Sequence, residues 1–138
     1  MKHTLLLLLF LVTGALKAQS LSSDDLYVLC SEKMTSWDSI LIKKGFKEKY
    51  SGPKKEGGYI ALYQNKTKNE YIFVYANNDE KTTNANYYLP TKKAYLALCT
   101  DKKNLPPGFD YNRLGKVEYE GKIYYHLGFS IKEVTTSP

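Results

Sequence analysis

Most small enzymes build their sites from histidine, cysteine and paired carboxylates, and this chain has few of them. His126 is the one histidine after residue 18, which excludes a metal site made of several imidazoles. A Ser–His–Asp triad would have to use His126, but the chain contains no Gly-x-Ser-x-Gly elbow. The Gly57-Gly58 pair lacks the Lys and Ser or Thr that follow in a phosphate-binding loop. These patterns favour a protein without catalytic, metal or cofactor chemistry.

Two groups of carboxylates leave an alternative open. Glu118 and Glu120 share a face of a predicted strand and could form the acid–base pair of a small hydrolase. Charged side chains on a solvated strand face explain them more simply. The run Asn77-Asn78-Asp79-Glu80 has adjacent carboxylates but lacks the regularly spaced oxygen ligands of a calcium loop.

Tyrosine is the most distinctive residue of the chain, which has 13 of them, all after residue 18. A tyrosine gives a large, rigid contact area with a polar tip and is therefore common in binding surfaces. It also has a high strand propensity, which is the alternative explanation. The residues that we predict to form a binding face are Tyr59, Tyr63, Tyr71, Phe73, Tyr75, Tyr124 and His126.

A predicted hairpin over residues 57–76 positions most of these side chains. Two runs rich in β-branched and aromatic residues flank a polar tip at 65–69, which indicates a five-residue loop. Alternation along the strands then predicts an aliphatic core face and a partly accessible aromatic face. The aliphatic face contains Ile60, Leu62, Ile72 and Val74, and the aromatic face contains Tyr59, Ala61, Tyr63, Tyr71, Phe73 and Tyr75.

The remaining elements predict a helix-on-sheet domain. Capping residues and apolar spacing indicate helices at about 23–34 and 35–44, the second ended by Gly45, and a third after Pro90. Further strands are expected at 46–50, 85–89, 114–119 and 122–132, the last two joined by a Glu120-Gly121 turn. In the last strand, Ile123, Tyr125, Leu127, Phe129 and Ile131 share one face. We therefore predict an α+β two-layer domain, with an antiparallel sheet of about five or six strands and two or three helices on one face. A short-strand β-barrel is the alternative.

The first 18 residues have the layout of a secretory signal peptide. Lys2 and His3 precede an apolar run over 5–16, and Leu16-Lys17-Ala18 resembles a cleavage site. The run is shorter than the ~20 residues that span a bilayer. We therefore expect a signal peptide at 1–18, a single exported domain at 19–138, and a periplasmic or secreted location.

Charge and cysteine content describe the exported part further. Without Lys2 and Lys17, 18 of the 20 basic residues remain against 14 acids, a net charge of +4. The lysines are scattered and Arg113 is the one arginine, which does not favour a nucleic-acid surface. In an exported protein, Cys30 and Cys99 predict one disulfide, with two buried free thiols as the alternative.

These observations favour an exported, non-enzymatic binding protein that engages another protein, as an inhibitor or an immunity factor does. A glycan- or cell-wall-binding module and a small carboxylate-dependent hydrolase are the alternatives. Neither a cofactor nor a nucleic-acid partner is expected, nor a membrane span after signal cleavage. Coplanar exposed aromatics would favour a glycan, a patch rimmed by lysines a protein, and a cleft with facing carboxylates an enzyme.

Export is directly testable. We expect mass spectrometry of protein recovered outside the cytoplasm to show an N-terminus near Gln19, because the apolar run is followed there by the predicted cleavage site. An intact Met1 in that fraction would contradict the prediction.

Overall fold

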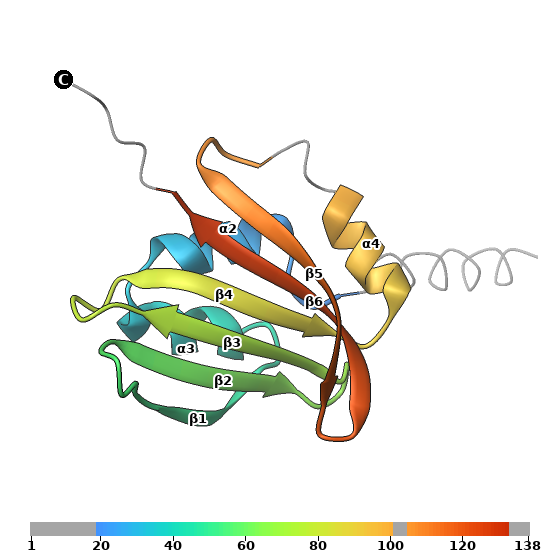
Figure 1. Ribbon diagram of the computed structural model, residues 1–138, viewed down its shortest axis with the longest axis horizontal. Helices are drawn as coiled ribbons and strands as arrows, with labels where there is room; N and C mark the ends of the chain where they lie inside the picture. The colour runs from blue at the N-terminus through green and yellow to red at the C-terminus, as the bar shows by residue number, and fades with distance from the viewer. Residues whose placement is uncertain (1–18, 101–104, 133–138) are drawn as a thin grey trace, which may run out of the picture.

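The computed structural model describes residues 19–100 and 105–132; the predicted signal peptide lies outside the described residues. Figure 1 shows the arrangement of the elements. The helices are α2 (Ser23–Ser31), the 3-10 helix η1 (Met34–Ser36), α3 (Trp37–Ile42) and α4 (Lys92–Thr100). The strands are β1 (Lys47–Pro53), β2 (Tyr59–Asn65), β3 (Glu70–Ala76), β4 (Thr82–Leu89), β5 (Phe109–Tyr119) and β6 (Lys122–Ile131).

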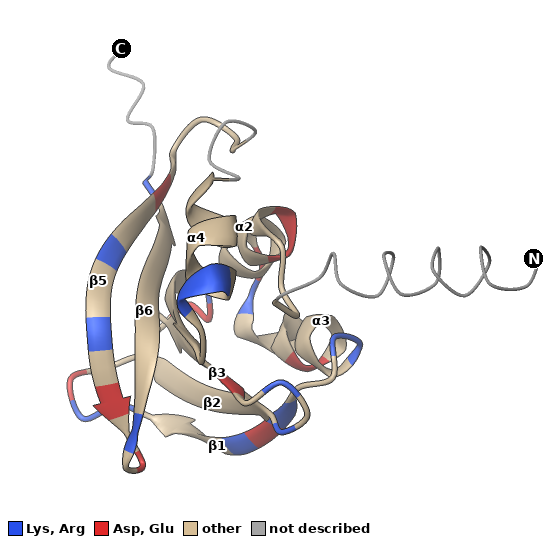
Figure 2. Cartoon of the chain, turned by 90° about the vertical axis from the view of Figure 1, so that its right-hand side faces the viewer, with Lys and Arg blue, Asp and Glu red and all other residues tan. Residues whose placement is uncertain are grey.

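The six strands form one antiparallel sheet in the order β1-β2-β3-β4-β6-β5. The helices lie on one face of this sheet, and the opposite face has no helix over it among the described residues (Figure 2). This arrangement confirms the predicted α+β two-layer domain.

The N-terminal helices begin where the sequence predicts. Ser22 Oγ accepts the backbone N–H of Asp25 at 3.2 Å, and an Asp25 carboxylate oxygen accepts the N–H of Ser22 at 2.9 Å. This reciprocal capping box fixes the start of α2. The second helical stretch ends just before Gly45, whose φ of 87° favours glycine.

The main core lies between the sheet and the helices. Helix α2 contributes Leu26 and Leu29, which are fully buried at a spacing of three residues. The sheet contributes, among others, Ile72, Val74, Ala85, Tyr87, Leu89 and Leu127, all without exposed surface. Each of these strand residues alternates with one that faces the helix-free side.

The pairing of β2 with β3 differs from the prediction by one residue. The loop between Asn65 and Glu70 has four residues, 66–69, and Asn69 adopts a left-handed conformation with φ 54°. As a result Leu62 lies opposite Phe73 and not opposite Ile72. Because side chains alternate with a period of two, a shift of one residue exchanges the faces of one strand relative to the other.

The predicted division of this hairpin into an aliphatic and an aromatic face is therefore wrong. Ile60 and Leu62 share the helix-free face with Tyr71, Phe73 and Tyr75. Ile72 and Val74 share the helix-covered face with Tyr59, Ala61 and Tyr63. Each face is a mixture of aliphatic and aromatic side chains.

The turn and the second strand of the β5–β6 hairpin follow the sequence signal, whereas β5 begins at Phe109 and not at residue 114 as predicted. Glu120 and Gly121 form the turn with φ values of 49° and 76°, as a two-residue turn with positive φ at both positions requires. Leu127 and Phe129 of β6 are buried in the main core, as predicted. Ile123 is 55% exposed, because β6 pairs with β4 only as far as Tyr125 and the hairpin extends beyond it.

The sheet bends sharply at this hairpin. Strand β5 lies three positions from β3, which in a flat sheet would separate them by about 14 Å. The rings of Tyr119 on β5 and Phe73 on β3 are nevertheless only 5.8 Å apart. A bulge in β5 between Arg113 and Gly115 occurs along the same hairpin, and bulges bend strands. The end of the hairpin therefore folds over the helix-free face (Figure 1).

Truncation of Ile72 tests the assignment of the core face. Ile72→Ala removes a fully buried side chain and should lower the free energy of unfolding by about 2–5 kcal/mol. Ile42→Ala is the matched control, because Ile42 is 58% exposed and its truncation should cost far less. Denaturant unfolding of both variants measures the difference, and equal losses would contradict the assignment.

Candidate functional site

A second, smaller cluster of apolar and aromatic residues lies on the helix-free face, and we call it the outer aromatic cluster. Leu62, Tyr71 and Tyr124 form its buried part. Phe73, Tyr88, Val117 and Tyr119 are partly exposed and pack against them. The members come from β2, β3, β4, β5 and β6, so the bend of the sheet brings them together.

The rings of this cluster pack edge to face. Tyr71 contacts Tyr119 at 4.9 Å and Tyr124 at 5.5 Å between centroids, with interplanar angles of 72° and 88°. Tyr119 also contacts Tyr88 at 5.8 Å and 70°. Such pairs contribute about 0.5–1.5 kcal/mol each beyond their burial. The rings are therefore held in fixed orientations that are not coplanar.

Hydrogen bonds fix the polar ends of the two buried tyrosines. Tyr71 accepts a hydrogen bond from Gln64 Nε2 at 2.9 Å and donates to Glu120 at 3.1 Å. Tyr124 donates to Asn69 at 2.9 Å. Burial, and then the neighbouring Glu120 carboxylate, raise the pKa of Tyr71 above its usual range. The Tyr71–Glu120 and Tyr124–Asn69 hydrogen bonds join the end of the β5–β6 hairpin to the β2–β3 hairpin.

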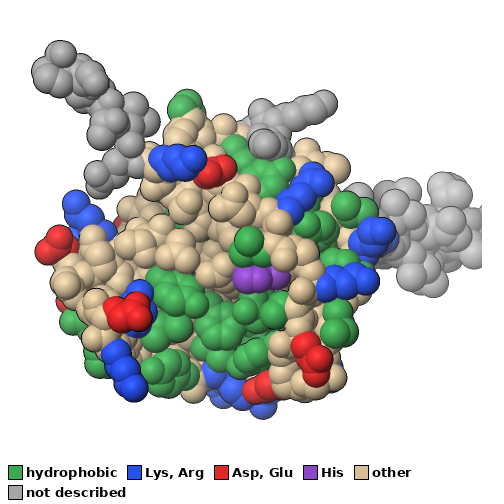
Figure 3. All heavy atoms as spheres, in the orientation of Figure 1, with side chains coloured by type: hydrophobic (Ala, Val, Ile, Leu, Met, Phe, Trp, Pro, Cys, Tyr) green, Lys and Arg blue, Asp and Glu red, His purple; other side chains and the backbone are tan. Residues whose placement is uncertain are grey.

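The accessible part of this face extends beyond the cluster. Tyr75 continues the face along β3 and is partly exposed, and the Lys54 ammonium lies 5.4 Å from its ring centroid. This distance allows a cation–π contact. Figure 3 shows hydrophobic side chains gathered over this face of the molecule, with lysines and acidic residues around them.

His126 borders the cluster as an uncharged group. Its ring packs edge to face on Tyr88 at 4.6 Å, and its Nε2 donates to the Asn86 side-chain oxygen at 2.9 Å. Burial lowers the pKa of His126 below its usual 6.5, so the ring is neutral at pH 7. The partner of Nε2 is thus a neutral amide and not a carboxylate.

The structure brings five of the seven predicted binding residues to the helix-free face: Tyr71, Phe73, Tyr75, Tyr124 and His126. Tyr59 and Tyr63 lie on the opposite, helix-covered side, which corrects their predicted position. Tyr63 is 2% exposed and its hydroxyl donates to Asp38 at 2.7 Å. Sequence reasoning missed Tyr88 and Tyr119, although the alternation of Tyr87 and Tyr88 along β4 indicates that one of them faces outward.

The carboxylates of the hydrolase alternative occupy different surroundings. Glu120 lies in the hairpin turn and accepts the Tyr71 hydrogen bond, whereas Glu118 lies opposite the exposed Ile123. A cavity of about 280 Å³ beside β1 and β2 is lined by Asp38 and Glu48, among other residues. Asp38 accepts from Tyr63, and Glu48 accepts from Ser51 at 2.8 Å. Both carboxylates of that cavity are thus already engaged by neighbouring hydroxyls.

Cys30 and Cys99 are free thiols in the structure, which contradicts the predicted disulfide. Both side chains are buried in the main core, 4% exposed each. Cys30 Sγ approaches the Phe129 carbonyl oxygen at 3.9 Å, whereas Cys99 contacts Tyr95 and Arg113. Each thiol therefore has its own surroundings, and burial raises the pKa of Cys30 to about 12.

No known protein family, curated protein or solved structure matches this chain. Within the described residues, every helix is too short or too polar to cross a bilayer, and no group of three or more His, Cys, Asp or Glu side chains could hold a metal ion. A function can therefore be inferred only from the arrangement of the side chains.

The state of the cysteines gives a further prediction. Alkylation of the folded protein should be slow, because both thiols are buried and burial raises their pKa values. After unfolding without reductant, both Cys30 and Cys99 should become labelled, as mass spectrometry would show. Protection of both after unfolding would mean that the disulfide forms.

Proposed function

We propose that this chain is a non-enzymatic binding protein that engages another protein through the outer aromatic cluster and the adjoining Tyr75. The observation that carries the proposal is the partly exposed aromatic surface on a sheet face without a helix over it. A structural role alone accounts for the buried members of the cluster. The members at the edge also pack on one another, but part of their surface stays accessible to a partner.

The chemistry of this edge suits a protein partner. Aromatic residues are enriched in protein interfaces and provide most of their strongest contacts. Phe73, Tyr88 and Tyr119 are already held by neighbouring rings, at 5.2 Å between Phe73 and Tyr88 and 5.8 Å between Tyr88 and Tyr119. These side chains would therefore lose little conformational entropy when a partner binds. Lys54 beside Tyr75 adds a charged group at the rim.

The orientation of the rings is less suited to a glycan. A sugar stacks on the flat face of an aromatic ring, and a chain of sugars needs several faces in one plane. Phe73 and Tyr119 meet at 87°, and Tyr88 and Tyr119 at 70°. The tilted rings instead form an uneven surface of edges and faces, which an irregular protein surface can match.

Two variants at the edge test the proposal. Tyr75→Ala and Tyr88→Ala should each weaken capture of a protein partner from an extract of the source cells by roughly tenfold or more, the effect of losing one strong interface residue. Tyr75→Ala should change the melting temperature little, because Tyr75 is only partly buried. Tyr88→Ala should lower it by several degrees, because Tyr88 packs against the rings of Phe73, Tyr119, Tyr124 and His126, so capture by this variant is measured well below its melting temperature. Leu96→Ala is the control, since Leu96 is 43% exposed on α4, on the opposite side of the sheet.

The same assay separates the ligand classes. Digestion of the extract with a protease before capture should abolish binding if the partner is a protein. Capture that survives digestion, and that is lost in the two tyrosine variants, would replace the protein partner with a glycan. Equal capture by all three variants and the unchanged protein would overturn the proposed surface.

A further inference from the structure

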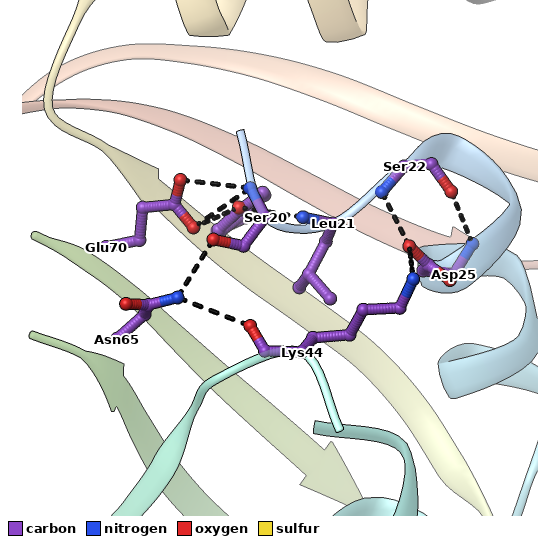
Figure 4. A network of polar contacts seen from close by, with 8 residues as sticks. Ser20, Leu21, Ser22, Asp25, Lys44, Asn65 and Glu70 are labelled. Carbon is purple, nitrogen blue, oxygen red and sulfur yellow. Dashed lines mark hydrogen bonds and ion pairs between the residues drawn. The ribbon is translucent and has the colours of Figure 1, made fainter. Parts of the chain in front are cut away.

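The segment that leads into α2 is held by a buried carboxylate at the start of β3 (Figure 4). Glu70 has no exposed surface. Its two oxygens accept the backbone N–H of Ser20 at 3.1 and 3.3 Å, and one of them accepts the Tyr87 hydroxyl at 2.6 Å. Tyr87 in turn accepts the N–H of Leu21 at 3.3 Å. The backbone of residues 20 and 21 is thus fixed to this one acid.

Side chains around the acid hold the same segment. Asn65 Nδ2 donates to Ser20 Oγ at 2.9 Å and to the Lys44 carbonyl at 3.3 Å. Leu21 is 1% exposed and belongs to the main core. The position of residue 20 relative to Glu70 is therefore set by contacts on both sides.

The electrostatic surroundings of Glu70 favour an added positive charge. Burial raises the pKa of Glu70, while hydrogen bonds from Tyr87 and Ser20 and the charge of Lys68 lower it in part. The groups that face the carboxylate are the Tyr87 hydroxyl from β4, the backbone and hydroxyl of Ser20, and Lys68 from the β2–β3 loop. A buried carboxylate is costly, and another cation within a few ångströms would favour its ionised form.

We propose that Glu70 binds the α-ammonium group that cleavage after Ala18 would create at Gln19. The nitrogen of Gln19 precedes that of Ser20 along the chain, and covalent geometry keeps the two within about 4 Å. Rotation about the Cα–C bond of Gln19 can bring its α-ammonium group toward the Glu70 carboxylate. In the uncleaved chain this nitrogen is an uncharged amide, so cleavage adds a positive charge beside a buried acid. The inference rests on the predicted cleavage and is independent of the proposed binding surface.

The pairing has a chemical consequence for Gln19. An N-terminal glutamine cyclises when its neutral α-nitrogen attacks its own side-chain amide carbon, which forms a C–N bond and releases ammonia. A nitrogen held as ammonium has no lone pair for this attack. Glu70 would therefore slow the loss of ammonia from the processed chain and preserve its N-terminal charge.

The pKa of the α-amine tests the pairing. We compare the chain that begins at Gln19 with one that begins two residues earlier and carries Lys17→Ala, which keeps the side-chain charges equal. The chain that begins at Gln19 retains all the residues that make the contacts described above, because these begin at Ser20. The rate of amine acylation against pH, followed by mass spectrometry, gives the pKa of each amine.

The amine at Gln19 should have a pKa about one unit above the usual 7.7–8.0, so that acylation at pH 7 is roughly tenfold slower than in the extended chain. Because this pKa is raised by folding, the added stability should be present below it and disappear as pH rises through it. Glu70→Gln keeps the shape and an acceptor for Ser20, and should return the pKa to the usual value and speed the cyclisation of Gln19.

If Glu70→Gln does not fold, the comparison of the two chains that keep Glu70 still decides. Equal amine pKa values in these two chains would overturn the proposal. An exported protein whose N-terminus lies elsewhere than Gln19 would overturn it as well, because the amine would then be out of reach of Glu70.

Discussion

The pairing of Leu62 with Phe73 decides which side chains each face of the sheet carries. With this register, Ile72 and Val74 reach the helices and complete the main core, while Tyr71 and Phe73 point to the face without a helix. A shift of one residue in β3 would expose Ile72 and bury Phe73 under the helices. The four-residue loop with a left-handed Asn69 thus determines the content of both the core and the outer aromatic cluster.

The bend of the β5–β6 hairpin then converts an exposed face into a partly closed one. Tyr119 and Tyr124 lie near the end of this hairpin and cover Tyr71, whose side chain is only 4% exposed as a result. Without the bend, these rings would lie on separate strands as isolated surface residues. The cluster therefore depends on contacts between strands that are not neighbours, and these contacts also stabilise the curvature of the sheet.

Local signals predicted the elements well. The capping box at Ser22, the turn at Glu120-Gly121 and the alternation of β6 all lie where the sequence places them, because each depends on residues close in the chain. The register of β2 with β3 was missed, since a loop of four or of five residues fits the same composition. The curvature was missed, and the disulfide was favoured over the free thiols, for a related reason: both depend on how distant segments meet, which periodicity does not encode.

The segment from Asn65 to Tyr71 contacts both the segment before α2 and the outer aromatic cluster. On the helix side, Asn65 and Glu70 hold the segment before α2 through Ser20. On the other side, Asn69 accepts from Tyr124 of the outer aromatic cluster, and Tyr71 donates to Glu120. Successive residues of this hairpin tip thus serve opposite faces of the sheet. The contacts that hold the N-terminal segment and those that hold the buried tyrosines thus come from neighbouring residues of one turn.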